Sequence, residues 1–151
     1  MYRHILVPVD GSALALSAAR DAVALAKTLG AKVTAFVSTP SFRYVTLDPV
    51  MSRVGPKRYE VESGRFAGRT LEAVKKLAKA ARVPCSIEHA VGYPPHREIL
   101  RAARRHRCDL IVMGSHGRSG VGALLLGSQA NGVLTHGSVP VLVLRARRRR
   151  A

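Results

Sequence analysis

The chain has 151 residues, 47% of them hydrophobic, and its 25 Lys and Arg against 9 Asp and Glu give a formal net charge of +16. This length and apolar content suit a single compact domain, and no apolar run approaches the roughly 20 residues that a membrane-spanning helix needs. The first apolar run, residues 5–9, is too short for a secretion signal, so we expect a cytoplasmic protein in which Cys85 and Cys108 are reduced.

Short β-branched runs alternate along the chain with longer segments of helical periodicity. The first predicted strand covers residues 4–10, and Ser12 can cap a helix predicted over residues 13–29. Asp10 lies between the strand and the helix. It could cap the helix only, or cap the helix and also contact a ligand, and the sequence favours both equally. A second strand is predicted at residues 32–38. Residues 39–56 contain prolines together with aromatic residues, so we expect a loop that folds over another part of the protein.

The alternation continues to the end of the chain. We predict a helix over residues 59–81, a strand over 84–91, a helix beginning near Pro95, a strand over 109–113, a helix over 128–136 and a strand over 139–144. Asp109 begins its strand, so we expect it at the edge of the sheet opposite the site. Gly132 lies early in the last helix, where glycine costs roughly 1 kcal/mol relative to alanine, and we expect it to loosen the amino-terminal end of that helix. Alternating strands and helices of this kind predict an α/β fold with a parallel sheet, whose ligands bind beyond the carboxyl ends of the strands.

A glycine-rich segment, residues 114–128, separates the strand at 109–113 from the helix at 128–136. It reads G-S-H-G-R-S-G-V-G-A-L-L-L-G-S, with glycines at 114, 117, 120, 122 and 127. Glycine lets backbone amides approach an anion without a Cβ in the way. A phosphate placed there would also meet the positive end of a helix dipole, and Ser128 would add a hydroxyl donor. The segment therefore predicts a phosphate site.

The spacing of these glycines separates the segment from two common phosphate motifs. Residues 122–128 nearly spell G-x-x-x-x-G-K-[ST], but the lysine is missing, and no G-x-G-x-x-G follows the first strand. The pattern that fits is G-x2-G-x9-G-[ST], which places Gly114, Gly117, Gly127 and Ser128 at its fixed positions. Together with Asp10 at the end of I-L-V-P-V-D, this pattern resembles the ATP-binding branch of the universal stress protein family, and the resemblance covers nearly the whole chain.

The resemblance implies a fold, a ligand and a set of contacts. The fold is a five-stranded parallel sheet of order 3-2-1-4-5 with helices on both faces, Rossmann-like and similar to the adenine nucleotide alpha-hydrolases, over residues 1–145, followed by a basic tail at 146–151. The ligand is ATP, with Mg or Mn held through its phosphates. Val37 would meet the adenine through its backbone, and Asp10 would contact the nucleoside or the ion. Met113 and Gly114 would flank the ribose, while the phosphates would be bound by Gly117, Gly127, Ser128 and Gln129. A homodimer through the last strand is also implied.

Two further functions are weighed against simple ATP binding. Hydrolysis needs a positioned base and charge stabilisation, and Asp10 is the one acidic residue expected at the site, so we expect turnover to be absent or very slow. The tail arginines Arg147–Arg150 could contact nucleic acid through its phosphates.

His116 could touch a phosphate or be exposed to solvent, and the remaining histidines lack the spacing of metal ligands, so we assign no metal site. The favoured function is an ATP-binding, nucleotide-responsive switch or stress-tolerance factor.

Overall fold

A computed structural model describes residues 1–117 and 125–146 of the chain. Two glycines of the predicted phosphate segment, Gly120 and Gly122, lie outside these residues, and so do the tail arginines Arg147–Arg150. Within the described residues, every helix is too short or too polar to cross a lipid bilayer.

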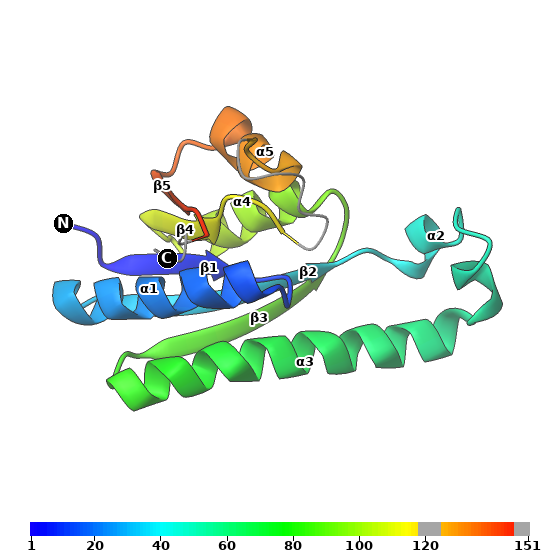
Figure 1. The fold of residues 1–151 in the computed structure, drawn as a ribbon, viewed down its shortest axis with the longest axis horizontal. Helices are drawn as coiled ribbons and strands as arrows, with labels where there is room; N and C mark the ends of the chain where they lie inside the picture. Colours follow the sequence, from blue (N-terminus) through cyan, green and yellow to red (C-terminus); the bar gives the residue numbers. More distant parts are fainter. Residues whose placement is uncertain (118–124, 147–151) are drawn as a thin grey trace, which may run out of the picture.

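The described residues form one five-stranded parallel sheet with the order β3-β2-β1-β4-β5, as expected (Figure 1). The strands are β1 (His4–Pro8), β2 (Lys32–Thr39), β3 (Cys85–Val91), β4 (Leu110–Gly114) and β5 (Val141–Leu144). Ile5 in β1 pairs with Val33 of β2 on one side and with Leu110 of β4 on the other. The chain leaves β1 toward β2 and only later returns to place β4 on the other side, so the topological switch point lies between β1 and β4.

Helices cover both faces of the sheet (Figure 1). On one face lie α1 (Ala13–Leu29) and α3 (Pro56–Ala81), which share a core with residues such as Val7 and Val33. On the other face lie α4 (Pro95–Arg105) and α5 (Ser128–His136), which share a second core with Leu6 and Phe36. The expected single domain with helices on both faces is therefore what the structure shows, and β5 forms one of the two edges of the sheet.

The bounds of α1 follow directly from its sequence. Its buried positions are Ala15, Ala18, Ala19, Ala22, Val23 and Ala26, a face of mostly small residues that lets the helix lie close to the sheet. The Ser12 side chain accepts a hydrogen bond from the amide of Ala15 and begins the helix, and Gly30 ends it in the left-handed conformation with φ of +65°.

Residues 39–56 are more structured than the expected loop. They contain a short helix, α2 (Phe42–Val45), and a 3-10 turn at Met51–Arg53. The Tyr59 hydroxyl donates to the carbonyl of Pro40 at 2.6 Å, and the rings of Phe42 and Tyr59 are 5.7 Å apart. These contacts pack the segment against the first turns of α3, which begins at Pro56 rather than at residue 59 because proline suits the first position of a helix.

Gly132 in α5 allows close contact with α4. A Cβ built on this glycine would lie 2.5 Å from Cγ of His96, and the rings of His96 and His136 stack with centroids 5.4 Å apart. The glycine is buried within a regular helix, and its helix propensity alone does not indicate this packing, which favours a residue without a side chain.

We expect Gly132→Ala to lower the free energy of unfolding by about 1 kcal/mol. The gain in helix propensity is about 1 kcal/mol, but forcing a methyl group into a filled space costs about 1–3 kcal/mol. Urea denaturation of the purified variants measures the difference. The matched control is Gly68→Ala in α3, where nothing lies within 4 Å of the new Cβ and the propensity gain should stand alone. Equal stabilisation by both substitutions would contradict the packing role of Gly132.

Candidate functional site

A cavity of about 550 Å³ opens at the carboxyl ends of β1 and β4, at the topological switch point. This volume is within the range of about 300–1,000 Å³ that is usual for small-molecule sites. Among the described residues it is lined by Pro8, Val9, Asp10, Ala15, Phe36, Ser38, Pro95, Ile99, Met113, Gly114, His116, Gly117, Leu125, Leu126, Gly127, Ser128, Gln129 and Ala130. Seven of the eight site residues predicted from the sequence are in this set, and Val37 is the exception.

Asp10 joins the end of β1 to the glycine segment. One of its carboxylate oxygens accepts a hydrogen bond from the amide of Ser12 at 3.0 Å, so the side chain helps to shape the start of α1. A Cβ built on Gly117 would lie only 2.1 Å from the other oxygen, Oδ2. The two parts of the chain therefore lie close together here, and a side chain at position 117 would require the Asp10 carboxylate to shift. This contact fixes one wall of the cavity.

The glycine segment is closed at its base by Gly127. Its amide donates to the carbonyl of Ser115 at 2.6 Å, and the amide of Ser115 donates in turn to the carbonyl of Leu144 in β5 at 2.8 Å. A Cβ on Gly127 would lie 2.8 Å from Cα of His116 and 2.9 Å from the Ser115 carbonyl oxygen. Both atoms are backbone, so the two ends of the segment can meet in this way only with glycine at position 127.

The start of α5 presents backbone donors to the cavity. The first hydrogen bond of this helix is the one that the amide of Asn131 donates to the carbonyl of Gly127 at 2.9 Å. The amides of Ser128, Gln129 and Ala130 precede this bond and belong to the first turn of the helix, whose amides have no partner within the helix. Such amides, together with the helix dipole, attract anions. Gly127 rather than Ser128 is the N-cap of α5, and this cap has no side-chain hydrogen bond.

Gln129 has a structural contact that the sequence did not predict. Its side-chain oxygen accepts a hydrogen bond from the amide of His96 at 2.8 Å, in the first turn of α4. Its side-chain nitrogen donates to the Ser128 hydroxyl at 3.3 Å. The side chain thus ties the starts of α4 and α5 together across the cavity wall, while the backbone amide of Gln129 remains at the helix start.

Val37 lies in β2 between two residues that line the cavity, Phe36 and Ser38. Its side chain is buried on the opposite face of the sheet, in the core shared with α1 and α3. Contact with a ligand is therefore left to its backbone, the role that the sequence resemblance implies. Met113 and Gly114 end β4 and line the cavity directly.

The apolar walls of the cavity were missed by the sequence analysis. They include Phe36, Pro95 and Ile99, together with Leu125 and Leu126 from the end of the glycine segment. Leu125 is 70% exposed and Leu126 is 40% exposed. Leucines within a glycine-rich segment are a sequence signal that could have indicated an apolar wall of the cavity.

The charged groups of the cavity are few. Among its described lining residues, Asp10 is the one carboxylate, His116 is the one imidazole, and lysine and arginine are absent. His116 is half-buried, and its Nδ1 lies 3.1 Å from the Ser115 hydroxyl. Within the described part of the chain, no three His, Cys, Asp or Glu side chains are grouped closely enough to hold a metal ion.

Asp109 directly precedes β4 and lies far from this cavity, as expected. Its carboxylate accepts hydrogen bonds from the amides of Arg3 and His4 at 2.9–3.1 Å. Desolvation acts to raise the pKa of Asp109, but these amides outweigh it and hold the pKa below its ordinary value. Both cysteines are free thiols, and burial raises the pKa of Cys108 to about 12, so this thiol is unreactive.

Comparison with known proteins gives one consistent family. The model of the universal stress protein family matches residues 1–145. Universal stress protein MJ0531 of Methanocaldococcus jannaschii is 34% identical over 148 residues, which cover 96% of this chain and 83% of that protein. Universal stress protein YxiE of Bacillus subtilis is 33% identical over 152 residues, which cover 96% of this chain and all of that protein.

Solved structures agree with this comparison. Hypothetical protein MJ0577 superposes with a TM-score of 0.76 at 26% identity and covers 98% of this chain and 99% of its own. Two universal stress proteins at lower identity share the fold: one in complex with cAMP, with a TM-score of 0.63 at 23% identity, and one from Archaeoglobus fulgidus in complex with dAMP, with a TM-score of 0.68 at 22% identity. These two cover 95% and 94% of this chain and 97% of their own chains.

Proposed function

This chain belongs to the universal stress protein family, and on that premise we propose that it binds ATP or another adenine nucleotide in the cavity between β1 and β4. The observation that carries the proposal is the contact of three chain segments there: Asp10 on Gly117, Gly127 on Ser115, and the first amides of α5 beside them. Amides without a partner at a helix start suit phosphates, and the apolar walls suit a base.

Two further observations support an adenine nucleotide as the ligand. Proteins of the same fold have been solved with cAMP and with dAMP, which share the adenine base and a phosphate. The net charge of +16 also attracts a polyanionic ligand toward the protein. ATP, with Mg or Mn bridging its phosphates, would use the amides of Gly117, Gly127, Ser128 and Gln129, with Val37 and Asp10 nearer the nucleoside.

The proposed role is binding with absent or very slow hydrolysis. A hydrolase needs a base for water and positive charge at the transferring phosphoryl group. Among the described lining residues Asp10 is the only carboxylate, and it already holds the amide of Ser12. ATP turnover at ordinary enzyme rates that disappears in Asp10→Ala would overturn this part of the proposal.

Isothermal titration calorimetry with ATP, ADP, AMP and cAMP in the presence of magnesium tests the proposal. Mass spectrometry of the small molecules that copurify with the protein gives an independent test. We expect saturable binding of at least one adenine nucleotide. Absence of heat and of any thermal shift with millimolar adenine nucleotides, on a folded sample, would refute it.

The nucleotide is proposed to act as a switch through the segment that binds its phosphates. Bound phosphates would stabilise residues 114–127 and change the surface that this segment offers to a partner in a stress response. Hydrogen exchange with and without ATP measures this change. Equal protection of residues 114–127 in both states would contradict the switch and leave simple binding intact.

We further propose a homodimer that forms through β5. This strand is an edge of the sheet, and Leu142 on it is 40% exposed. An exposed apolar edge strand readily pairs with another strand. Light scattering on the purified protein measures the mass, and a monomer at tens of micromolar would contradict the dimer.

The cytoplasm is the proposed location, and the tail arginines Arg147–Arg150 are proposed to add a weak contact to nucleic acid. The tail lies outside the described residues. Microscopy of a fluorescent fusion tests the location. Deletion of the tail tests the contact, and unchanged RNA affinity at physiological salt would argue against it.

A further inference from the structure

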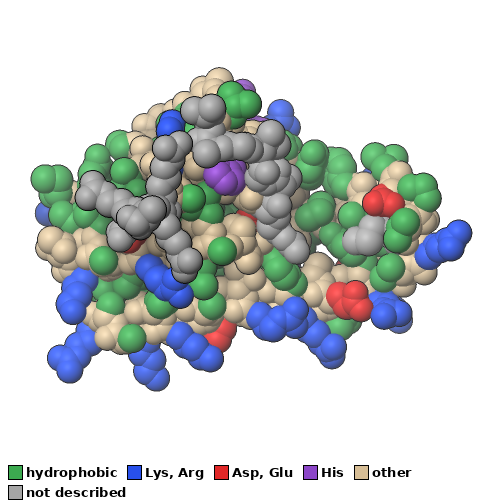
Figure 2. Space-filling model, in the orientation of Figure 1, with side chains coloured by type: hydrophobic (Ala, Val, Ile, Leu, Met, Phe, Trp, Pro, Cys, Tyr) green, Lys and Arg blue, Asp and Glu red, His purple; other side chains and the backbone are tan. Residues whose placement is uncertain are grey.

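The outer face of α3 carries a row of basic side chains. The helix buries Ala67, Leu71, Val74 and Ala78 against the sheet. On its exposed side and at its end lie six cations, which we call the basic ridge: Arg65, Arg69, Lys75, Lys76, Lys79 and Arg82. In Figure 2, Lys and Arg side chains follow the lower edge of the molecule, where Figure 1 places α3. The ridge is on the opposite face of the sheet from α4 and α5.

The charges of the ridge are not neutralised within the described structure. Between residues 65 and 82 the sequence contains one acidic residue, Glu72. Among the described residues, the ion pair on α3 is that of Arg58 with Glu62 near the start of the helix, and no ridge residue forms one. The ridge therefore presents six cations at the surface with one carboxylate, Glu72, among them.

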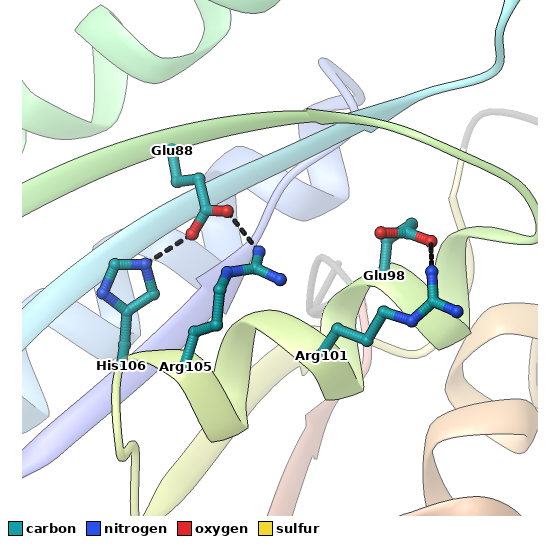
Figure 3. A network of polar contacts seen from close by, with 5 residues as sticks. All are labelled: Glu88, Glu98, Arg101, Arg105 and His106. Atoms are coloured by element: carbon teal, nitrogen blue, oxygen red, sulfur yellow. Dashed lines mark hydrogen bonds and ion pairs between the residues drawn. The ribbon is translucent and has the colours of Figure 1, made fainter.

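The other basic helix, α4, differs in this respect (Figure 3). Arg101 donates to Glu98 at 2.7 Å, and Arg105 and His106 both contact the carboxylate of Glu88. Its arginines are thus partly neutralised by carboxylates of α4 and β3. The ridge lacks such pairing among the described residues, so α3 presents a more positive surface to a partner than α4 does.

Three cations of the ridge lie along one line of α3. Arg65, Arg69 and Lys76 are separated by four and seven residues, close to one and two turns, so they lie along one line of the helix. At about 1.5 Å per residue, the line from Arg65 to Lys76 is about 16 Å long. Each strand of a nucleic-acid duplex carries one phosphate per about 3.4 Å of the duplex axis, so a line of this length lies beside several phosphates.

The residues around the ridge disfavour two other partners. Among the described exposed apolar side chains of large size, α3 contributes Val61, which precedes the ridge, and Phe66 packs partly buried against the core. Stacking of unpaired bases needs exposed aromatic rings, and insertion into a lipid surface needs an apolar face. We propose that the basic ridge of α3 binds the phosphate backbone of double-stranded nucleic acid without reading its sequence.

Fluorescence anisotropy of the full chain with a labelled duplex of about 20 base pairs, titrated over a range of salt, tests this proposal. The ridge variant carries Arg65→Gln, Arg69→Gln and Lys76→Gln together. The matched control carries Arg20→Gln, Lys27→Gln and Arg104→Gln, three exposed cations elsewhere with the same change in net charge. We expect the ridge variant to bind at least about tenfold more weakly, with a salt slope lower by about 3, and the control to change much less. Glu72→Gln should strengthen binding.

Several results would overturn the proposal. Equal weakening by both triple variants would assign binding to net charge alone, and loss of binding only on deletion of residues 147–151 would assign it to the tail. Stronger binding to phosphatidylserine vesicles than to duplex at the same salt would favour a membrane. Far-UV circular dichroism and ATP titration confirm that each variant is folded, since the ridge lies outside the nucleotide cavity.

Discussion

Gly127→Ala is expected to weaken adenine-nucleotide binding by roughly 10- to 100-fold. The new Cβ would lie 2.8 Å from Cα of His116 and 2.9 Å from the carbonyl oxygen of Ser115, and neither backbone atom can move away alone. Overpacking of this kind costs about 1–3 kcal/mol, and each 1.4 kcal/mol is a factor of ten in affinity. The strain is relieved only if the base of the glycine segment opens, which displaces the amides at the start of α5. Calorimetric titration with ATP measures the loss.

A matched glycine separates this effect from a general loss of flexibility. Gly64 lies on α3, and nothing lies within 4 Å of the methyl group that alanine would add there, so Gly64→Ala should bind ATP with unchanged affinity. Gly117→Ala, which would press on the Asp10 carboxylate, tests the other side of the cavity without a backbone clash and should also weaken binding. Full affinity in both Gly127→Ala and Gly117→Ala, with the variants folded, would show that the nucleotide binds elsewhere.

The elements with complete local signals were predicted from the sequence. Helix α1 was predicted with the bounds that the structure shows, because Ser12, a periodic row of alanines and Gly30 all indicate the same helix. The alternation of strands and helices predicts a parallel sheet but not the order of its strands. That order was predicted from the resemblance to the universal stress protein family. The segment at residues 39–56 was predicted as a loop because α2 is held by Tyr59 and its neighbours, contacts that join residues far apart in the sequence.

The candidate site divides in the same way. The glycines of the cavity were predicted because their spacing is a local property of residues 114–128. The wall formed by Phe36 and Ile99 was not, because a buried residue on a strand or helix shows the same pattern whether it faces the core or a cavity. The contacts of Gln129 with His96, and of Gly132 with the same histidine, depend on how α4 and α5 cross, and no local pattern indicates this.

Phe36→Ala is expected to lower the free energy of unfolding by about 3–5 kcal/mol. Phe36 is 1% exposed and is the largest of the fully buried side chains. It packs with Leu6, Ile99 and Ile111 beneath α4 and α5, so its removal leaves a hole among residues held by two helices and three strands. This loss is a large part of the roughly 5–15 kcal/mol that stabilises a typical domain. Urea denaturation followed by circular dichroism measures it.

The same residue couples the stability of the core to the proposed site, because Phe36 also lines the cavity. A ligand that binds only the folded state stabilises it by about 2.7 kcal/mol at a hundredfold excess over its dissociation constant, so saturating ATP should restore much of the lost stability if the cavity still binds it. Leu47→Ala is the control: this side chain is 86% exposed, and its removal should change stability by less than about 0.5 kcal/mol. A loss below about 1 kcal/mol in Phe36→Ala would mean that α4 and α5 move to fill the space left by the ring. The cavity that these helices border together with β2 would then be deformable, and its shape would not be fixed by the packing of Phe36.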